Sequence, residues 1–280
     1  MSKLIPFSGL IAALMLWSGG ALAQTPTLPP ATPLPALSQQ GHVDHAGASI
    51  WYGIVGEGSP VLLLHGGRAT SLSWGAQVAA LVAGKHRVIL IESRGHGRST
   101  LGTQPLSYEL MESDVVAVMD ALGIGQTDVA GWSDGANISL VMAMRHPERV
   151  KRIFAFGPNM NQRYLTPPRN SPLFAEVGAR LEAEYASVAA DPRGFGRLTT
   201  EVRKMQAVEP NYSDAQLAAT RGPRIAIVGA SEDEFISRRH LEYVASTIPG
   251  ATLIMLDHVS HFAPWQDAAT FNNVLTGFLQ

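Results

Sequence analysis

The sequence predicts an α/β fold in which a mostly parallel sheet is flanked by helices and carries a helical cap insertion. Short β-rich runs alternate with amphipathic segments along most of the chain, a pattern typical of a parallel sheet wrapped by helices. Of the 280 residues, 46% are hydrophobic and only 16% are charged, which suits a sheet covered on both faces. Helical segments interrupt the alternation at residues 158–223, and an insertion between two strands predicts a cap over the sheet's carboxyl edge.

The composition excludes several classes of function. The net charge of -2 provides no basic surface for nucleic acid, so no nucleic-acid partner is expected. The chain has 0 cysteines, which excludes a disulfide framework, a cysteine-ligated metal site and a cysteine nucleophile. Beyond the amino terminus no stretch reaches about 18 apolar residues, so we expect the mature chain to remain outside the membrane.

The amino terminus is expected to direct export. Residues 1–23 combine the basic Lys3, an apolar run too short to span a membrane and a small-x-small sequence that ends at Ala23. This pattern predicts a signal peptide cleaved after Ala23 and a periplasmic or secreted protein. The alternative, a buried helix, is disfavoured because Gly19 and Gly20 would end it. Residues 24–41 contain five prolines and no charge, which predicts an extended linker.

The core domain is expected to comprise residues 42–157 and 224–280. Its predicted strands are at 50–55, 61–64, 87–91, 128–130, 150–156, 224–228 and 252–256. Its predicted helices are at 73–84, 107–122, 134–145, 237–248 and 264–279. Ser107 is a typical amino-terminal cap, and Gly84 and Gly123 are typical of the residues at which helices end.

The cap at residues 158–223 is expected to contain two or three amphipathic helices. Hydrophobic residues recur there at spacings of three or four, at Phe195, Leu198, Val202 and Met205. A capping box at 213–216 predicts the start of another helix. A second, unrelated domain is the less favoured alternative, because a segment of this size would form only a thin core of its own.

The sequence Gly131-Trp-Ser133-Asp-Gly135 is a G-x-S-x-G motif. Such a motif arises easily by chance, but here a predicted buried strand runs directly into it and a helix begins directly after it. That context places Ser133 on a sharp turn between glycines, with the helix amino terminus favouring negative charge beside it. We therefore predict that Ser133 is a nucleophile.

A second loop follows the predicted strand at 61–64. Hydrolysis of an acyl compound forms an oxyanion, which two backbone N–H groups usually stabilise. The expected donors are Gly67, in the sequence His65-Gly66-Gly67, and Asp134, which follows the nucleophile. A plain tight turn is the alternative for the two glycines. We expect His65 to support this loop through a buried hydrogen bond.

The base is expected after the last strand, since related chemistry follows the chain order Ser, then Asp or Glu, then His. Two histidines lie there, and His261 is favoured because the final helix begins shortly after it. His258 is expected to be a loop residue. A metal site that combines Asp257 with the two histidines is not predicted, because no further cluster of ligands is visible.

The acid that orients the histidine is expected after the strand at 224–228. Three carboxylates follow that strand, and Asp233 is our choice. Glu232 is the second candidate, while Glu234 is expected to belong to a solvated charged loop.

Together these motifs resemble the α/β-hydrolase superfamily, and among its members the biphenyl hydrolase-like and valacyclovir hydrolase-like serine hydrolases. The resemblance covers about residues 42–280 and rests on HGG at 65–67, ESRGHGRS at 92–99, GWSDGA at 131–136, FAFGPN at 154–159, DEFI at 233–236 and HF at 261–262. The chain departs from the usual pattern at Glu92, where Asp is common, and in a longer acid loop. The superfamily also contains lactonases, peroxidases, dehalogenases and epoxide hydrolases, but the last two use Asp where this chain has Ser133.

The resemblance implies hydrolysis of esters or related acyl compounds. Together with the predicted signal peptide and the candidate triad, it predicts an exported serine hydrolase that cleaves carboxylic esters of small molecules through an acyl-enzyme, without a cofactor. We expect Trp74, Trp132, Asn159 and Met160 to line the substrate pocket, with core packing as the alternative for the tryptophans. A lactonase or a cofactor-free peroxidase could use the same residues, and a non-catalytic binding protein is the alternative from another class. The sequence gives no prediction of oligomeric state.

Overall fold

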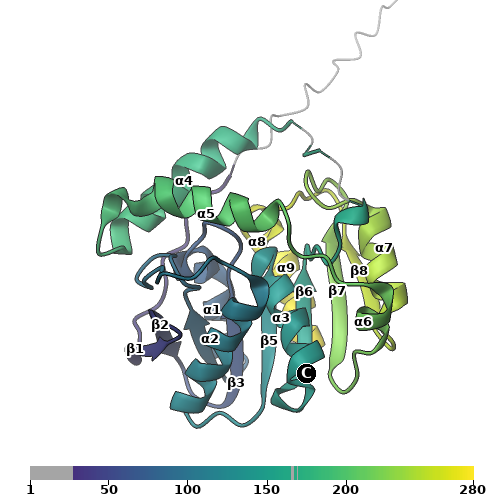
Figure 1. Cartoon of the computed structure of the whole chain (residues 1–280), viewed down its shortest axis with the longest axis horizontal. Coiled ribbons are helices and arrows are strands. Elements are labelled where there is room, and N and C mark those ends of the chain that lie inside the picture. Colours follow the sequence, from purple (N-terminus) through teal and green to yellow (C-terminus); the bar gives the residue numbers. More distant parts are fainter. Residues whose placement is uncertain (1–27, 165–166, 169) are drawn as a thin grey trace, which may run out of the picture.

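A computed structural model of the chain describes residues 28–280 except 165, 166 and 169, so the predicted signal peptide lies outside the described residues. An eight-stranded sheet of order β1-β2-β4-β3-β5-β6-β7-β8 forms its centre (Figure 1). The strands are β1 (Gln39–His45), β2 (Ala48–Val55), β3 (Ser59–Leu64), β4 (His86–Ile91), β5 (Thr127–Trp132), β6 (Val150–Phe156), β7 (Arg224–Ala230) and β8 (Thr252–Leu256). β2 is antiparallel to β1 and β4, and all other neighbours are parallel. The predicted, mostly parallel α/β sheet is confirmed.

Helices cover both faces of the sheet. They are α1 (Gly75–Ala83), α2 (Tyr108–Ala121), α3 (Asp134–Arg145), α4 (Leu173–Val188), α5 (Phe195–Gln206), α6 (Asp214–Ala218), α7 (Arg238–Thr247), α8 (Ala263–Gln266) and α9 (Ala268–Phe278). Successive side chains of a strand point to opposite faces. Leu62 and Leu64 therefore join the core under α2, α3 and α7, whereas Val61 and Leu63 join the core under α1, α8 and α9.

Local capping explains where several helices begin. The Ser107 side chain accepts a hydrogen bond from the backbone N–H of Leu110 at 3.1 Å and starts α2, as predicted. The single helix expected at 264–279 is instead two helices that meet at Asp267. The Asp267 carboxylate accepts a hydrogen bond from the backbone N–H of Thr270 at 3.0 Å, so it starts α9 as a separate helix.

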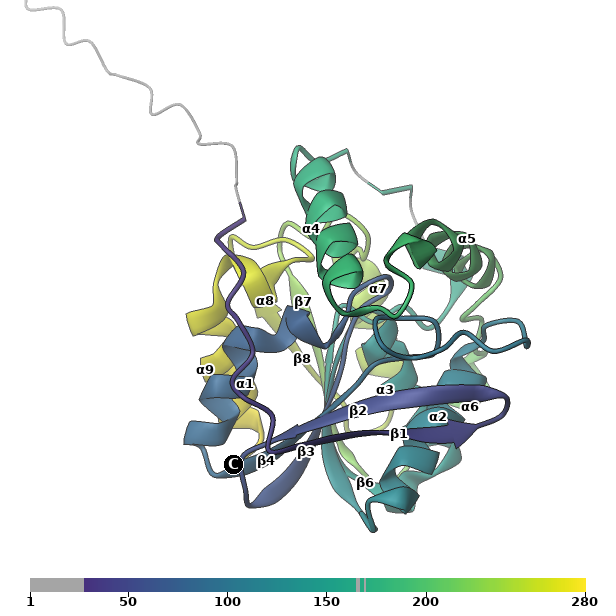
Figure 2. The ribbon, with the colours of Figure 1, turned by 90° about the vertical axis from the view of Figure 1, so that its left-hand side faces the viewer.

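The amino-terminal part of the sheet differs from the expectation. Strand β1 was not predicted, and it begins at Gln39, so the last residues of the segment expected as a linker belong to the sheet. β1 is an edge strand with mostly polar side chains, which explains why it lacks the apolar alternation of a strand. Residues 28–38 run along the core beside α8 and α1 before entering β1 (Figure 2).

The cap helices α4, α5 and α6 lie between β6 and β7 in the sequence, and α4 and α5 lie across one end of the sheet (Figures 1 and 2). In α5 the predicted apolar stripe is confirmed, since Leu198, Val202 and Met205 are buried. Leu173 and Val177 of α4 join the core that contains α8 and α9. Among the described residues, each helix is too short or too polar to cross a membrane.

Candidate active site

Ser133 lies on the sharp turn that joins β5 to α3. Its backbone has φ +55° and ψ −116°, a region that costs a residue with a side chain on the order of 1–3 kcal/mol. Both glycines of the motif are required by space, since a Cβ on Gly135 would overlap the carbonyl of Leu64 and one on Gly131 would overlap Gly135. The predicted strained turn is therefore present, and Ser133 remains partly exposed.

His261 and Asp233 form a buried pair. Asp233 Oδ2 lies 2.8 Å from His261 Nδ1, and both side chains are almost fully enclosed. The other carboxylate oxygen, Oδ1, accepts hydrogen bonds from the backbone N–H groups of Phe235 at 2.8 Å and Ile236 at 2.7 Å. Because an ionised carboxylate can only accept, Nδ1 carries the proton and the Nε2 of a neutral His261 is left able to take one.

The other candidate acids and bases occupy different environments. Glu232 and His258 are exposed, and neither contacts His261 through a side chain. Glu234 was expected in a solvated loop, and this is wrong: it is buried and accepts a hydrogen bond from the backbone N–H of His261 at 3.2 Å. In the part of the chain that the structure describes, no group of three or more potential ligand side chains could hold a metal ion.

The pKa of His261 is set by opposing effects. Burial acts to lower it, because a charged imidazolium loses its hydration. The nearby carboxylates of Asp233 and Glu234 favour the charged form and outweigh burial, so the pKa of His261 is raised above its ordinary value. These two carboxylates therefore stabilise the protonated form of His261.

The backbone at the end of β6 brings Ser133 close to His261. The N–H of Ser133 donates to the carbonyl of Phe156 at 2.8 Å, and the next residue, Gly157, has φ +63°. A Cβ on Gly157 would lie only 2.8 Å from Cε1 of His261, so the imidazole packs directly over this turn. No hydrogen bond joins Ser133 Oγ to His261 Nε2 among the described contacts. In hydrolases such a bond often tightens only with substrate present.

Gly67 lies beside Asp134, the other predicted oxyanion donor. A Cβ on Gly67 would lie 2.5 Å from Oδ2 of Asp134, which places the loop after β3 directly against the start of α3. The turn continues through Arg68, whose backbone N–H donates to Nε2 of His96 at 3.0 Å. Burial, followed by the neighbouring His65, lowers the pKa of His96 to about 3, so this acceptor nitrogen stays unprotonated.

The predicted supporting role of His65 is confirmed. Its Nε2 accepts a hydrogen bond from the backbone N–H of Ser93 at 3.1 Å, so its Nδ1 is the donor to the carbonyl of Gly66 at 2.8 Å. Burial lowers the pKa of His65 and keeps the ring neutral. His65 therefore joins the loop after β3 to the loop after β4.

The side chain of Asp134 connects the site to the cap, a feature that the sequence did not reveal. Its carboxylate accepts a hydrogen bond from the hydroxyl of Tyr108 at 2.7 Å and from the amide of Gln206, the last residue of α5, at 3.0 Å. Burial raises the pKa of Asp134, and these two donors partly oppose that effect. Neither Tyr108 nor Gln206 belongs to a motif, because their roles depend on contacts between distant segments.

The residues expected to line the pocket have different surroundings. Trp74 is fully buried and packs edge-on against Trp132, with ring centroids 6.2 Å apart, which corresponds to the core-packing alternative. Trp132 is also buried, and its Nε1 donates to the carbonyl of His261 at 2.9 Å. Asn159 is partly exposed beside the site, whereas Met160 is fully buried.

Glu92 organises the loop that follows β4. Its fully buried carboxylate accepts hydrogen bonds from the backbone N–H and hydroxyl of Ser71 at 3.2 and 2.8 Å. It also accepts from the backbone N–H and guanidinium of Arg98 at 2.6 and 2.7 Å. The glutamate that departs from the usual aspartate thus ties together the loops on either side of the site.

Replacing Glu92 with alanine is expected to lower the free energy of unfolding by about 3 kcal/mol, because four donors lose a buried charged acceptor. Urea denaturation measures this loss. Glu109 provides a matched control: it pairs with Arg145 at 2.8 Å but is 54% exposed, so its replacement by alanine should cost less than about 1 kcal/mol. Equal losses in both variants would show that the Glu92 network is not stabilising.

Comparisons with known proteins agree with the fold. Residues 59–169 match the family model described as alpha/beta hydrolase fold. The putative carbamate hydrolase RutD of Azorhizobium caulinodans is 30% identical over 263 residues, which are 84% of this chain and 96% of the relative. The 2-hydroxy-6-oxo-6-phenylhexa-2,4-dienoate hydrolase of Burkholderia cepacia is 23% identical, with coverage of 80% and 88%. Among solved structures, an enol-lactonase from Burkholderia xenovorans superimposes with a TM-score of 0.68 at 21% identity, over 85% of this chain and 99% of the enol-lactonase.

Proposed function

The chain belongs to the α/β-hydrolase family, and we propose that it is an exported serine hydrolase that cleaves carboxylic esters of small molecules. The observation that carries this proposal is the 2.8 Å contact between Asp233 and His261 beside the strained turn of Ser133. These residue types in this arrangement are those of a nucleophile, a base and the acid that orients the base.

In the first half of the proposed reaction, the Oγ of Ser133 attacks the ester carbonyl while the Nε2 of neutral His261 takes the hydroxyl proton. The backbone N–H groups of Gly67 and Asp134 hold the oxyanion of the tetrahedral intermediate. When the carbon–oxygen bond to the leaving group breaks, the imidazolium returns its proton to the departing alcohol. An acyl-enzyme on Ser133 remains.

In the second half His261 takes a proton from a water molecule as the water oxygen attacks the acyl carbonyl. The second tetrahedral intermediate then breaks its bond to Ser133 Oγ and releases the carboxylic acid, while His261 returns the proton to Oγ. Asp233 stays ionised throughout, fixes the tautomer and stabilises the imidazolium. Every proton in these steps moves between Ser133, His261, the substrate and water, so the proposed reaction requires no cofactor.

Labelling with a fluorophosphonate probe tests the proposal, because such a probe reacts with an activated serine. We expect stoichiometric labelling of Ser133 and turnover of small carboxylic esters. A panel of lactones, carbamates and amides separates the ester proposal from activities like those named for the relatives. An unlabelled protein with no turnover would favour a binding protein on a hydrolase fold.

The proposal of export is supported by the composition of residues 1–23. We expect the protein isolated from its native cells to begin at Gln24, which N-terminal peptide mass spectrometry determines directly. A mature protein that begins at Met1 would contradict export by signal cleavage.

The rate is expected to increase with pH as His261 loses its proton, since only the neutral imidazole can act as the base. Because the pKa of His261 is raised, the midpoint of kcat/KM against pH should lie above about 6.5, with a plateau in mild alkali. Initial rates in buffers of constant ionic strength give the profile. A rate unchanged between about pH 5 and pH 8 would show that this histidine does not control the reaction.

A further inference from the structure

Residues 28–33, here called the strap, are joined to the cap by hydrogen bonds. The backbone N–H of Leu28 lies 3.3 Å from both carboxylate oxygens of Glu176, and the carbonyl of Pro29 accepts a hydrogen bond from Nη1 of Arg180 at 3.2 Å. Glu176 and Arg180 both belong to helix α4. The strap therefore contacts the cap through a few polar groups at its beginning.

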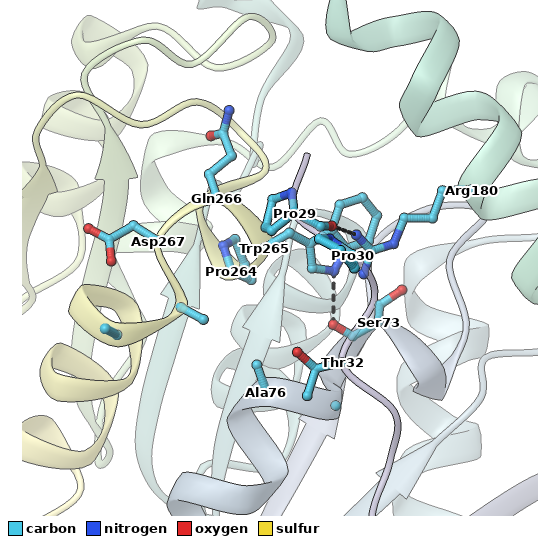
Figure 3. A pocket seen from close by; sticks show the side chains of 13 residues that line it. Pro29, Pro30, Thr32, Ser73, Ala76, Arg180, Pro264, Trp265, Gln266 and Asp267 are labelled. Atoms are coloured by element: carbon cyan, nitrogen blue, oxygen red, sulfur yellow. Dashed lines mark hydrogen bonds between the residues drawn. The ribbon is translucent and has the colours of Figure 1, made fainter. Parts of the chain in front are cut away.

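The strap also lies directly against the core. A Cβ on Gly75, the first residue of α1, would overlap the carbonyl of Thr32, so the helix begins with the one residue that leaves room for the strap. Beneath the strap a cavity of about 320 Å³ extends between α1 and α8 (Figure 3). Leu28 of the strap is buried in the core that contains α1, α8 and α9, so the strap is held by apolar packing as well as by its polar contacts with α4.

Arg180 joins the strap and the cap to helix α8. Its guanidinium lies over the ring of Trp265, 4.1 Å from the centroid (Figure 3). Its Nε donates to Glu184 at 3.0 Å. The indole Nε1 of Trp265 donates to the carbonyl of Ser73 at 2.9 Å, and the hydroxyl of Ser73 donates to Glu184 at 3.1 Å. The three side chains thus form a closed set of contacts around Ser73.

Trp265 in turn supports the candidate catalytic residues. Its ring packs edge-on against Trp132, with centroids 4.9 Å apart. Trp132 immediately precedes Ser133 and donates its indole N–H to the carbonyl of His261 at 2.9 Å. A displacement of Trp265 would therefore shift Trp132 and, through it, both Ser133 and His261.

We propose that the strap, acting through Arg180, holds cap helix α4 against Trp265 and so fixes the geometry that acyl transfer requires. Arg180 is in this view a positioning residue, and the proposal rests on the proposed function for its effect on rate. The prolines of the strap suit this role because their fixed φ reduces the entropy lost when the segment docks.

Spin-label distances test the position of α4 without reference to activity. The chain has no native cysteine, so labels on A179C of α4 and N273C of α9, both at exposed positions, are unique. We expect a single narrow distance distribution in the mature chain, and a shifted or broader one when residues 24–33 are deleted or Arg180 is replaced by alanine. Deletion of residues 24–27 alone and R193A, a cap arginine that is 92% exposed, are the controls.

Kinetics then test the link to the reaction. Deletion of residues 24–33 and R180A should each lower kcat for ester hydrolysis on the order of 10-fold, and the combined variant should be no slower than either alone. The shortened chain is expected to fold, since Leu34 and Leu37 still pack on the core. The pH midpoint should change little. Loss of the buried Leu28 lowers the urea midpoint, so kcat is compared under conditions in which every variant is folded, where a purely stabilising segment would leave kcat unchanged.

Two results would overturn the proposal. The first is an unchanged distance distribution in both variants, whatever their activity. The second is a kcat loss in the combined variant equal to the product of the two single losses, which would show that the strap does not act through Arg180. If the mature chain itself hydrolyses no ester, the proposed function fails, while the distance measurement still decides whether the strap positions α4.

Discussion

Replacing Ser133 with alanine is expected to lower kcat for ester hydrolysis by about 10⁶-fold, the scale of losses seen when the nucleophile of a serine hydrolase is removed. The Oγ would be the atom that forms the acyl-enzyme, so no other group of the site can substitute for it. The residual rate should reflect binding and the oxyanion donors alone. Alanine has a Cβ like serine, so the strained φ of +55° costs the same and the fold should persist.

A control for this variant lies in the same helix. Ser139 is fully buried in α3, and its hydroxyl donates to the carbonyl of Ala136 at 2.7 Å. Ser139→Ala removes a buried hydroxyl without touching the site, so it should retain nearly full kcat. Initial rates of ester hydrolysis give kcat for both variants, and the fluorophosphonate probe gives the fraction of reactive serine in each. Wild-type-like ester turnover by Ser133→Ala would place the nucleophile elsewhere.

Replacing Asp233 with asparagine is expected to lower kcat by about 10⁴-fold while the structure stays intact. The reason lies in the surroundings of the carboxylate. The backbone N–H groups of Phe235 and Ile236 point at Oδ1, so the amide oxygen of the asparagine must take that place. Its NH₂ group then faces Nδ1 of His261, which forces the proton onto Nε2 and leaves no base toward Ser133.

Glu232→Gln is the matched control, since it makes the same chemical change one residue earlier on an exposed side chain. It should leave kcat within about twofold, and steady-state kinetics on one small ester compare the two variants. If Glu232→Gln caused the larger loss, Glu232 and not Asp233 would be the acid.

The parts of the molecule that the sequence predicted are those governed by local pattern. Strand β6 and helix α3 have the predicted limits. An apolar run and a strand–glycine–helix turn can each be recognised from a few consecutive residues. Asp233 and His261 each follow a predicted strand, and the structure joins them by a hydrogen bond. In this case the order of the residues along the chain was enough to predict a contact between distant segments.

The features that sequence analysis missed depend on contacts between distant segments. Strand β1 is mostly polar, with Val43 as its single apolar side chain, and it is formed by pairing with β2. Glu234 looked like one of three charges in a loop, yet the fold buries it against the backbone of His261. Likewise, no pattern of spacing indicates that Tyr108 and Gln206, 26 and 72 residues away, share the carboxylate of Asp134.

The hydrogen bonds of Asp134 have a consequence for how this enzyme could diversify. The cap is inserted between β6 and β7, so an exchange with the cap of a homologue would replace it as a whole unit. In this chain one residue would serve both parts, because the proposed oxyanion donor is a backbone group of Asp134 and the side chain of the same residue binds Gln206 of the cap. A transplanted cap would therefore need a hydrogen-bond donor at the position of Gln206, or it would leave a buried carboxylate short of a partner beside the reacting carbonyl. Substrate range could therefore evolve through cap residues that contact neither Asp134 nor the strap.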